Sequence, residues 1–491
     1  MAGENQKHQL HIFFFPFLAH GHMIPTVDMA KIFASRGIRA TIIVTPLNVP
    51  LISRSIKESI DLGLPINVLP IKFSSQEHGL PEGCENADSM SSPSLFPAFL
   101  KATTMLQEPL EQLLQEHNPD CLIAGSFSPW ATDSAAKFGI PRIVFHGTGF
   151  FPLCVNESII LHQPYKDVES DSDPFVIPNL PGTEIQMTRM VLPYYVMTVE
   201  DNFVSKLIKA AKQSEVTSFG VVVNSFYELE GIYADHYKKV LGRRAWNIGP
   251  VSLCNRDNKE KSYRGKQASM DARDCLKWLD SKKPDSVLYI CFGSRSDFTE
   301  PQLKEIAMGL EASGQNFIWV VRERKKNKEE QGGDIDQDQG WLPEGFEKRM
   351  EGKGLIIRGW APQMLILDHE SIGGFVTHCG WNSTLEGVTA GVPMVTWPVS
   401  AEQFYNEKLV TQVLRIGVPV GVKKWVPVVG DYIEKEAIVK AVKEIMEGEE
   451  AEEMRKRTKK LASIAREAVE EGGSSYCDFN HLIEELEGLS K

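Results

Sequence analysis

Short, nearly unbroken runs of apolar residues alternate with amphipathic stretches along most of the chain. Apolar runs of this length are typical of parallel strands buried on both faces, and amphipathic stretches between them are typical of crossover helices. The pattern predicts an α/β fold with doubly wound parallel sheets. The strands predicted in the first half are His11–Phe17, Ala40–Thr45, Ile66–Ile71, Cys121–Ala124 and Arg142–Phe145, with helices over Thr26–Ala34 and Phe96–Gln115.

The same alternation begins again after a polar interval, which predicts a second domain of the same architecture. A chain of 491 residues is long enough for two such domains. We predict an N-terminal domain over 1–252, a linker of polar composition over 253–270, a C-terminal domain over 271–473 and a final helix over 474–491. The strands predicted in the second domain are Ser286–Phe292, Phe317–Val321, Leu355–Ile357, Gly374–Thr377 and Met394–Thr396.

Charge and cysteine usage narrow the class of protein. The formal charge is −12 and the basic residues are scattered, so we expect neither nucleic acid nor an anionic membrane as a partner. The eight cysteines show no C-x-x-C pair and no cluster of zinc spacing, so they are expected as reduced thiols. The apolar run near the N-terminus is too short for a membrane span. We expect a cytoplasmic protein that acts as a monomer.

Two acidic patterns resemble metal sites, and neither fits. Glu323–Gly340 contains three spaced aspartates, but its glycine comes one position late for a calcium loop, and Gly345 stands where a bidentate Glu is needed. Asp171 and Asp173 form a D-x-D pattern within a polar, loop-like run. We expect no metal.

The most informative segment runs from Trp360 to Gln403. It predicts a strand over Gly374–Thr377, a glycine turn and a helix, which together direct backbone N–H groups and a positive helix end at one point. That point suits a pyrophosphate. His378, Asn382 and Ser383 supply side-chain donors for the phosphates beside the Gly380 turn. Glu386 can accept hydrogen bonds from a ribose diol. Trp360 offers a flat face to a base, and Gln363 offers an amide to its edge. For any one of these residues, simple capping of the helix is the alternative.

This whole segment resembles, without a gap, the signature box of plant secondary-product UDP-glycosyltransferases. GHMIP (Gly21–Pro25) and WNIGP (Trp246–Pro250) extend the resemblance over essentially the whole chain. It implies the GT-B arrangement of two facing Rossmann-like domains, inverting transfer of glucose from UDP-glucose to a small lipophilic acceptor, and no metal or bound cofactor. By this resemblance, Trp360, Ala361 and Gln363 hold uracil, Glu386 holds ribose, His378, Asn382, Ser383 and Ser294 hold the phosphates, and Trp381, Glu402 and Gln403 contact the sugar, with Gln403 in the glucose-preferring form.

The reaction needs a base, because the acceptor oxygen must lose its proton as it attacks. His22 follows the first predicted strand, in the turn before a helix, where the helix dipole keeps an imidazole neutral. A histidine in such a turn is more often structural than catalytic, but the resemblance implies the catalytic role, since His22 precedes Pro25 by the family's interval. His20 is the rival, and the H-x-H pair alone supplies too few ligands for a metal.

The family's second catalytic residue, an aspartate that orients the histidine, is replaced here by Gly125. Losing the carboxylate of a comparable histidine–aspartate pair costs on the order of 10⁴ in rate. Ser126, Ser128 and Asp133 are candidates for a partial substitute. A carboxylic acid arrives already ionised and needs no base. We therefore hypothesise that the acceptor is a carboxylate or an acidic phenol of a plant metabolite such as a triterpenoid or flavonoid, and a triterpenoid hydroxyl is the alternative that stays open.

Two other functions stay open at this point. A catalytically weak UDP-sugar-binding protein is supported by Gly125 alone, and the complete signature box argues against a GT-B sugar-nucleotide epimerase. The acceptor is expected along segments rich in Phe, Met, Tyr and Leu, namely Ser89–Phe99, Phe145–Leu153 and Gln186–Asp201.

Overall fold

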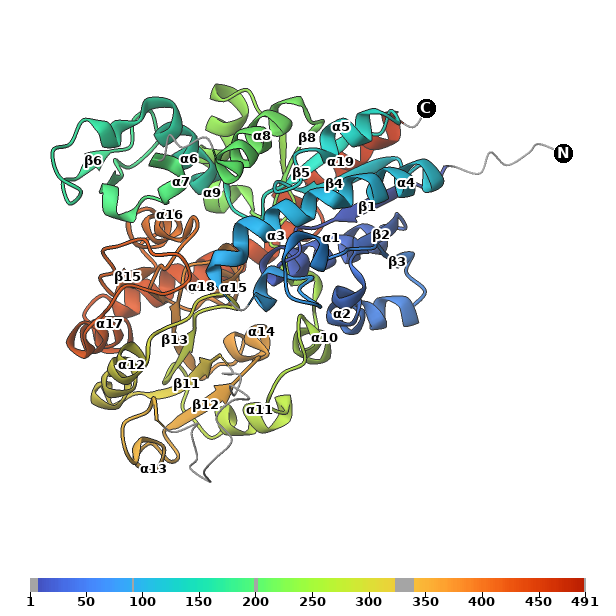
Figure 1. The fold of residues 1–491 in the computed structure, drawn as a ribbon. Helices are drawn as coiled ribbons and strands as arrows, with labels where there is room; N and C mark the ends of the chain where they lie inside the picture. Colours follow the sequence, from blue (N-terminus) through green and yellow to red (C-terminus); the bar gives the residue numbers. More distant parts are fainter. Residues whose placement is uncertain (1–7, 91, 198–201, 323–339, 490–491) are drawn as a thin grey trace. The chain divides into compact units, whose positions relative to one another are not determined.

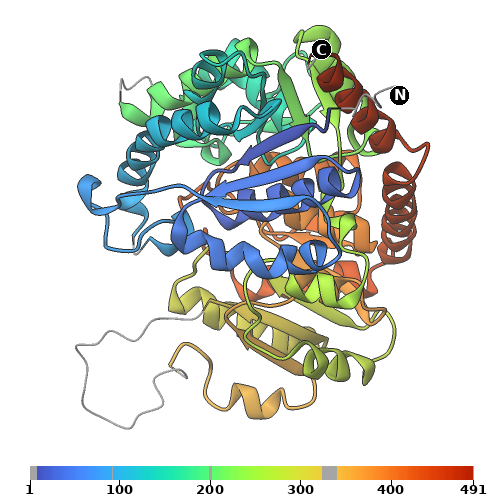
Figure 2. The same ribbon diagram turned by 90° about the vertical axis from the view of Figure 1, so that its right-hand side faces the viewer.

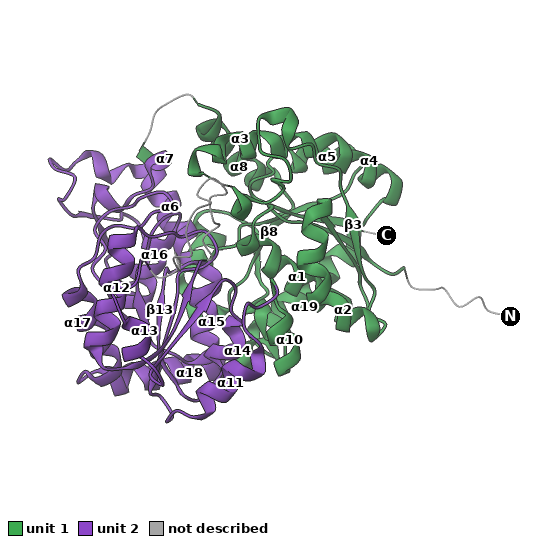
Figure 3. Cartoon of the chain, turned by 60° about the horizontal axis from the view of Figure 1, so that its bottom comes forward, with its two compact units in different colours: residues 1–150, 197–266, 466–491 green, residues 151–196, 267–465 purple. Residues whose placement is uncertain are grey.

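The chain packs as two compact units in a computed structural model, which describes residues 8–90, 92–197, 202–322 and 340–489 (Figure 1). Unit 1 comprises Met1–Phe150, Met197–Lys266 and Arg466–Lys491, and unit 2 comprises Phe151–Val196 and Gln267–Ala465 (Figure 3). All but the last residue of Glu323–Gly340, compared above with a calcium loop, lies outside the described residues. No helix in the described part of the chain is long and apolar enough to cross a membrane.

Unit 1 is built on a parallel sheet of seven strands. In the interior strand His11–Phe15, successive side chains point to opposite faces, so Ile12 and Phe14 enter one hydrophobic cluster while Phe13 and Phe15 enter the other. Both faces are therefore buried, as an unbroken apolar strand requires. In sheet order the strands are β3 (Ile66–Pro70), β2 (Arg39–Val44), β1 (His11–Phe15), β4 (Cys121–Gly125), β5 (Arg142–Phe145), β8 (Gly220–Val223) and β9 (Ala245–Asn247).

The α-helices of unit 1 come from three separate stretches of the chain. They are α1 (His20–Ser35), α2 (Val49–Asp61), α3 (Phe96–Thr103), α4 (Gln107–His117), α5 (Ala131–Ala136), α8 (Phe203–Thr217), α9 (Tyr227–Asp235), α10 (Asn258–Tyr263) and α19 (Ser474–Leu489). The predicted helix over Phe96–Gln115 is split into α3 and α4 by a 3-10 turn at Thr104–Leu106.

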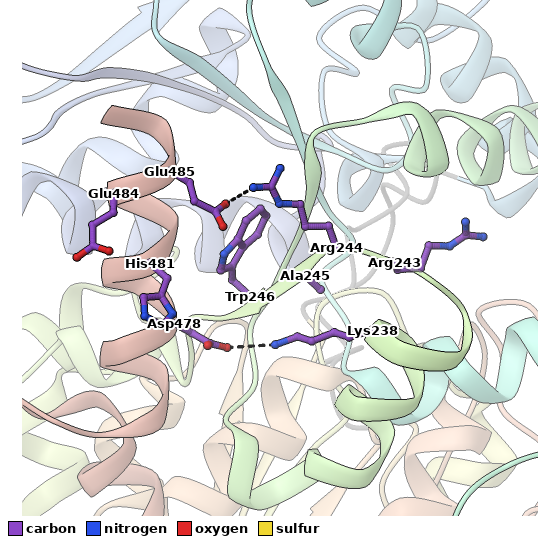
Figure 4. Close-up of a pocket in the computed structure, with 9 residues that line it drawn as sticks. All are labelled: Lys238, Arg243, Arg244, Ala245, Trp246, Asp478, His481, Glu484 and Glu485. Atoms are coloured by element: carbon purple, nitrogen blue, oxygen red, sulfur yellow. Dashed lines mark hydrogen bonds and ion pairs between the residues drawn. The ribbon is translucent and has the colours of Figure 1, made fainter. Parts of the chain in front are cut away.

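The last helix, α19, returns to the first sheet (Figures 1 and 2). Its residues Phe479, Leu482 and Leu486 belong to the same buried cluster as Ile12 and Phe14. Figure 4 shows the polar edge of this contact, where Asp478 pairs with Lys238 and Glu485 pairs with Arg244, along a pocket of about 450 Å³. The end of the chain is thus part of the core of unit 1.

Most of the predicted linker, residues 253–266, also packs with unit 1. Its polar composition reflects a buried network, in which Asp28 of α1 accepts hydrogen bonds from Asn255 (2.9 Å) and Arg264 (2.7 Å). Lys31 of α1 donates to Asn255 at 2.8 Å and to Glu260 at 3.0 Å. Polarity alone does not separate a solvated linker from a segment held by buried ion pairs.

Unit 2 contains a parallel sheet of six strands, and an antiparallel hairpin of β6 (Phe175–Val176) and β7 (Gln186–Met187). In sheet order the strands are β12 (Gly354–Arg358), β11 (Asn316–Val321), β10 (Val287–Cys291), β13 (Ile372–Thr377), β14 (Met394–Thr396) and β15 (Gly417–Pro419). The α-helices of unit 2 are α6 (Phe150–His162), α7 (Tyr194–Met197), α11 (Ala272–Asp280), α12 (Glu300–Ser313), α13 (Phe346–Arg349), α14 (Gln363–Leu367), α15 (Trp381–Ala390), α16 (Gln403–Lys408), α17 (Lys435–Glu447) and α18 (Ala451–Val469). Three of them, α6, α7 and α18, include residues that are assigned to unit 1.

These two Rossmann-like sheets give the predicted α/β fold of GT-B type. The ten predicted strands are present, two of them with the predicted ends and the others shifted at one or both ends by at most two residues. The strands β8, β9 and β15 of the two sheets, and the hairpin strands β6 and β7, were not predicted. The structure also assigns residues differently from the predicted boundary, because 151–196 pack with unit 2 although they precede the first sheet's last two strands in sequence. Compactness depends on contacts between distant segments, which composition does not report.

Candidate active site

The residues predicted for the donor follow four strands of the sheet in unit 2. They come after β10 (Ser294), β12 (Trp360, Ala361 and Gln363), β13 (His378, Gly380, Trp381, Asn382, Ser383 and Glu386) and β14 (Glu402 and Gln403). Carboxyl ends of parallel strands meet at one edge of a sheet. The strand order reverses between β10 and β13, and ligands of such folds bind at this switch point.

The turn between β13 and α15 exposes helix N–H groups at this edge. Gly380 is the extended N-cap residue of α15, so the first turn of the helix points its backbone N–H groups and its positive dipole end toward this edge. The His378 ring lies between two glycines, since a Cβ at Gly293 would be 2.6 Å from its Nε2 and one at Gly380 would be 2.5 Å away. Both positions must be glycine for the ring to fit.

Burial lowers the pKa of His378 to about 4, so its imidazole is neutral at pH 7. Its Nδ1 is buried and has no hydrogen-bond partner among the described residues. A neutral ring can offer one N–H donor to an anionic oxygen without adding a charge. His378 is therefore suited to a phosphate, together with the N-terminus of α15.

The side chains predicted for base, ribose and phosphate contact one another. Gln363 Nε2 donates to Glu386 Oε2 at 2.7 Å and to Ser383 Oγ at 3.1 Å, and Tyr289 donates its hydroxyl to Gln363 Oε1 at 3.3 Å. Trp360 is fixed by its backbone, which exchanges hydrogen bonds of 2.9 and 2.8 Å with Ser269. Tyr289 and Ser269 were not predicted, because nothing near them in sequence marks either as part of a site.

The loop after β14 holds the residues predicted for the sugar. Gln403 Oε1 accepts the backbone N–H groups of Val399 and Ser400, both at 2.8 Å, which leaves its amide nitrogen for a ligand. Asn406 donates to the carbonyl of Cys379 at 2.8 Å and to Glu402 at 3.4 Å, and so joins this loop to the β13–α15 turn. Burial raises the pKa of Glu402. Asn406 lies just beyond the predicted segment and is a further candidate.

His22 lies at the carboxyl edge of the first sheet. Its ring contacts those of Phe17 (centroids 5.4 Å apart) and Phe127 (5.8 Å), and a Cβ at Gly147 would be 3.0 Å from its Nδ1. These three neighbours stand two residues beyond β1, β4 and β5, which are adjacent strands.

The prediction of a helix from Thr26 is corrected: α1 begins at His20, so His22 lies in its first turn rather than before it. Pro25 lies inside the helix, whose first turn is closed by hydrogen bonds from His22 N–H and Met23 N–H to the Ala19 carbonyl.

The rival histidine, His20, is buried against a carboxylate. Asp88 Oδ2 accepts hydrogen bonds from both the backbone N–H and Nδ1 of His20, each at 2.7 Å. The Ala87 N–H also donates to Leu18 at 2.8 Å, so this distant segment is tied to the β1–α1 loop. Asp88 was not predicted, because the pair joins residues 68 positions apart. His20 has a structural partner and is a poor candidate for the base.

Gly125 ends β4, and its carbonyl accepts hydrogen bonds from the buried Arg142 (2.9 Å) and from Ser128 N–H (3.2 Å). A Cβ at this position would be 3.0 Å from the backbone nitrogen of Phe17, a tight but small conflict. Asp133, considered above as a substitute carboxylate, is exposed on α5. Gly125 therefore contributes only main-chain atoms near His22. The position where the resemblance implies an aspartate has no acidic side chain.

The remaining predicted segments have mixed outcomes. Phe99 and Phe150 are fully buried and serve the core, whereas Met90 and Phe96 are only partly buried. Residues 91 and 198–201 of the predicted acceptor segments lie outside the described residues. In the D-x-D pattern, Asp173 accepts hydrogen bonds from the backbone and side chain of Ser170, and this local bonding lowers its pKa.

The fold and the donor edge are those of a nucleotide-sugar transferase, and comparison with known proteins identifies the family. The model of the UDP-glucoronosyl and UDP-glucosyl transferase family matches residues 106–465, more than half of the chain. The scopoletin glucosyltransferase of Nicotiana tabacum is 57% identical over 98% of this chain and 99% of its own. The UDP-glucose flavonoid 3-O-glucosyltransferase 7 of Fragaria ananassa is 55% identical, over 100% and 99%.

A solved structure agrees with this assignment. The crystal structure of Glycyrrhiza uralensis UGT73P12, complexed with glycyrrhetinic acid 3-O-monoglucuronide, matches with a TM-score of 0.89 and 42% identity, over 98% of this chain and 96% of that one. The chain belongs to the UDP-glucuronosyl and UDP-glucosyl transferase family. It is a plant-type UDP-glucose glycosyltransferase of small secondary metabolites, with the GT-B fold.

Proposed function

We propose that this enzyme transfers glucose, with inversion, from UDP-glucose to an acidic phenol or a carboxyl group of a lipophilic plant metabolite, giving a β-glucoside or a glucose ester. The observation that carries the proposal is Gly125, because the position that usually supports the catalytic histidine offers no carboxylate. An acceptor that ionises readily compensates for that loss.

The donor is held without a metal or other cofactor in this proposal. The diphosphate accepts hydrogen bonds from the N-terminus of α15 and from His378, Asn382, Ser383 and Ser294. Uracil stacks on Trp360 beside Ala361 and Gln363, Glu386 accepts from the ribose hydroxyls, and Trp381, Glu402 and Gln403 contact glucose. The helix end and the neutral imidazole support these roles, since both suit a dianion that must later leave as UDP.

His22 is the proposed base, and its importance depends on the acceptor. At pH 7 a carboxyl group with a pKa of about 4 is almost fully ionised, whereas a phenol with a pKa of about 10 is ionised in roughly one molecule in a thousand. An aliphatic alcohol is ionised far less and needs a base in every turnover. Without an aspartate at 125, the imidazolium that forms on His22 is less stabilised, so alcohols suffer most.

Two of the relatives support the phenolic branch of the proposal. Those named for scopoletin and for flavonoids act on aromatic compounds that carry hydroxyl groups. The neighbour complexed with a glycyrrhetinic acid derivative supports a triterpenoid skeleton as a further candidate acceptor. The Phe17 and Phe127 rings beside His22 are compatible with either skeleton.

The test is Gly125→Asp, with Gly125→Asn as a matched control that has the same shape but no charge. The kcat/KM with UDP-glucose is measured for a carboxylic acid, an acidic phenol and an aliphatic alcohol, with the products identified by mass. We expect the natural chain to prefer the acidic acceptors. Gly125→Asp should raise the rate with the alcohol by about 10-fold or more, while Gly125→Asn should not.

Two results contradict the proposal. Equal or better turnover of aliphatic alcohols by the natural chain means that its acceptor need not be acidic. If the natural chain is inert with every acceptor and Gly125→Asp restores transfer, the chain is a weakly catalytic UDP-sugar-binding member of its family.

A further inference from the structure

The loop after β14 holds a strained residue directly before the two side chains assigned to the sugar. Ala401 has a φ of +54°, in the left-handed region that L-residues other than Asn and Asp rarely adopt. Glu402 and Gln403 follow immediately. A strained backbone of this kind persists only where surrounding contacts hold it, and such positions concentrate at functional sites.

Contacts from two directions hold this loop. Within it, Gln403 Oε1 accepts the N–H groups of Val399 and Ser400. From a separate segment, the indole Nε1 of Trp425 donates to the carbonyl of Ala401 at 3.2 Å, and Val426 N–H donates to the carbonyl of Val399 at 3.2 Å. The residue in the unfavourable conformation is therefore fixed by a side chain 24 positions away.

Trp425 is itself fixed by residues that precede the second sheet by about a hundred positions. Its backbone N–H donates to the carbonyl of Met190 at 2.8 Å. Its ring contacts those of Tyr194 (centroids 5.6 Å apart) and Tyr195 (6.5 Å). Burial and the nearby Glu402 carboxylate raise the pKa of Tyr195, which agrees with a packed contact between this segment and the loop.

We propose that Trp425 is a positioning residue for the donor sugar: through its hydrogen bond to Ala401 it maintains the conformation that aims Glu402 and Gln403. Trp425 acts through the loop and does not contact glucose. The inference rests on the proposed function in one respect, the assignment of Gln403 and Glu402 to the sugar. It adds that residues 190–195 influence sugar use, because they hold Trp425 in place.

The main test is Trp425→Phe, which removes the indole N–H and keeps an aromatic ring. The KM for UDP-glucose should rise by about 3- to 10-fold, the loss expected of one neutral hydrogen bond. Inhibition by UDP, which lacks the sugar, should stay within about 2-fold. Trp278→Phe on α11 of the same unit serves as the control, and both values should be unchanged in it.

Ala401→Gly distinguishes a positioning role from a general loss of stability, because it should rescue only the former. Glycine adopts a positive φ without strain, so the loop no longer needs the tie to Trp425. In the double variant Trp425→Phe/Ala401→Gly, the KM for UDP-glucose should return to within about 2-fold of the natural chain.

Three outcomes overturn the proposal, and they separate it from its premise. If Trp425→Phe leaves the KM for UDP-glucose unchanged while Gln403→Ala raises it, the loop binds sugar but Trp425 does not position it. If Trp425→Phe weakens UDP and UDP-glucose equally, or if Ala401→Gly gives no rescue, the residue only supports the fold of unit 2. If Gln403→Ala has no effect on UDP-glucose, the assignment of this loop to the sugar is wrong and the inference fails with it.

Discussion

At the scale of single residues, two glycines that lack side chains, Gly147 and Gly125, shape the surroundings of His22. Gly147 contributes no side chain where a Cβ would be 3.0 Å from His22 Nδ1, and it has a φ of +77°. Gly125 contributes none at the end of β4. The first glycine leaves room for the ring, and the second leaves the position without the carboxylate that the resemblance leads us to expect there.

Gly147→Ala should therefore impair catalysis more than folding. The added methyl group displaces the His22 ring by a few tenths of an ångström, and we expect kcat/KM with an aliphatic alcohol, the acceptor that needs a base, to fall by about 10-fold or more, since small misplacements of catalytic groups are costly. Gly139→Ala is the matched control, because Gly139 has a φ of +70° but nothing within 4 Å of an added Cβ. Both variants should lose similar stability, about 1–2 kcal/mol, by urea unfolding. Equal activities in the two variants would show that the ring is not constrained by Gly147.

At the scale of elements, α16 begins at Gln403, which is proposed for the sugar, and contains the buried acid Glu407. Glu407 is buried, and burial raises its pKa to about 7, although a hydrogen bond of 2.9 Å from Thr396 opposes the shift. Because the folded pKa lies above the unfolded value of about 4.5, folding favours the protonated form. The stability that this group contributes is complete below pH 4.5 and is lost as the pH rises through about 7.

Glu407→Gln should remove that pH dependence. The amide cannot ionise but still accepts from Thr396, so the variant should exceed the natural chain in stability at pH 8 by up to about 3 kcal/mol and should differ little at pH 4.5. The measurement is the urea midpoint at both pH values, followed by a signal from unit 2. Glu444→Gln, at an exposed position on α17, should shift neither midpoint. A Glu407→Gln effect of the same size at both pH values would contradict the assigned pKa.

At the scale of the whole molecule, the last helix belongs to the first sheet's core. Phe479 is 3% exposed and packs edge-on against Phe33 of α1, with ring centroids 4.7 Å apart. The core of unit 1 therefore includes Phe479, Leu482 and Leu486 of α19 as well as residues of the first sheet. Residues proposed for the donor all belong to unit 2.

Phe479→Ala should destabilise unit 1 by about 3–5 kcal/mol, the usual cost of removing a buried phenylalanine. Leu489→Ala, on the same helix but 54% exposed, should change stability by less than about 0.5 kcal/mol. Scanning calorimetry of each variant and of the natural chain measures the change in unfolding free energy. The affinity for UDP at low temperature should be unchanged in both variants. Similar destabilisation by the two substitutions would mean that α19 is not part of the core.

Local pattern was enough to predict much of this protein. Ten strands and the two-sheet plan follow from the sequence, because parallel strands buried on both faces have a signature within a few consecutive residues. The roles proposed for the donor residues between Trp360 and Gln403 come from the resemblance together with a strand–turn–helix pattern, and they stay predictions. Gly125 also stands out in the sequence, since the resemblance specifies what that position usually holds.

The tertiary structure alone decided the contacts that join distant segments. The pairing of His20 with Asp88, the network of Asp28 with Asn255 and Arg264, and the tie between Trp425 and Ala401 span from 24 to more than 200 positions. The start of α1 at His20 likewise depends on its surroundings, which override the usual effect of Pro25. Each of these features depends on two segments that folding brings together. The local sequence of one segment does not indicate which distant segment it will contact.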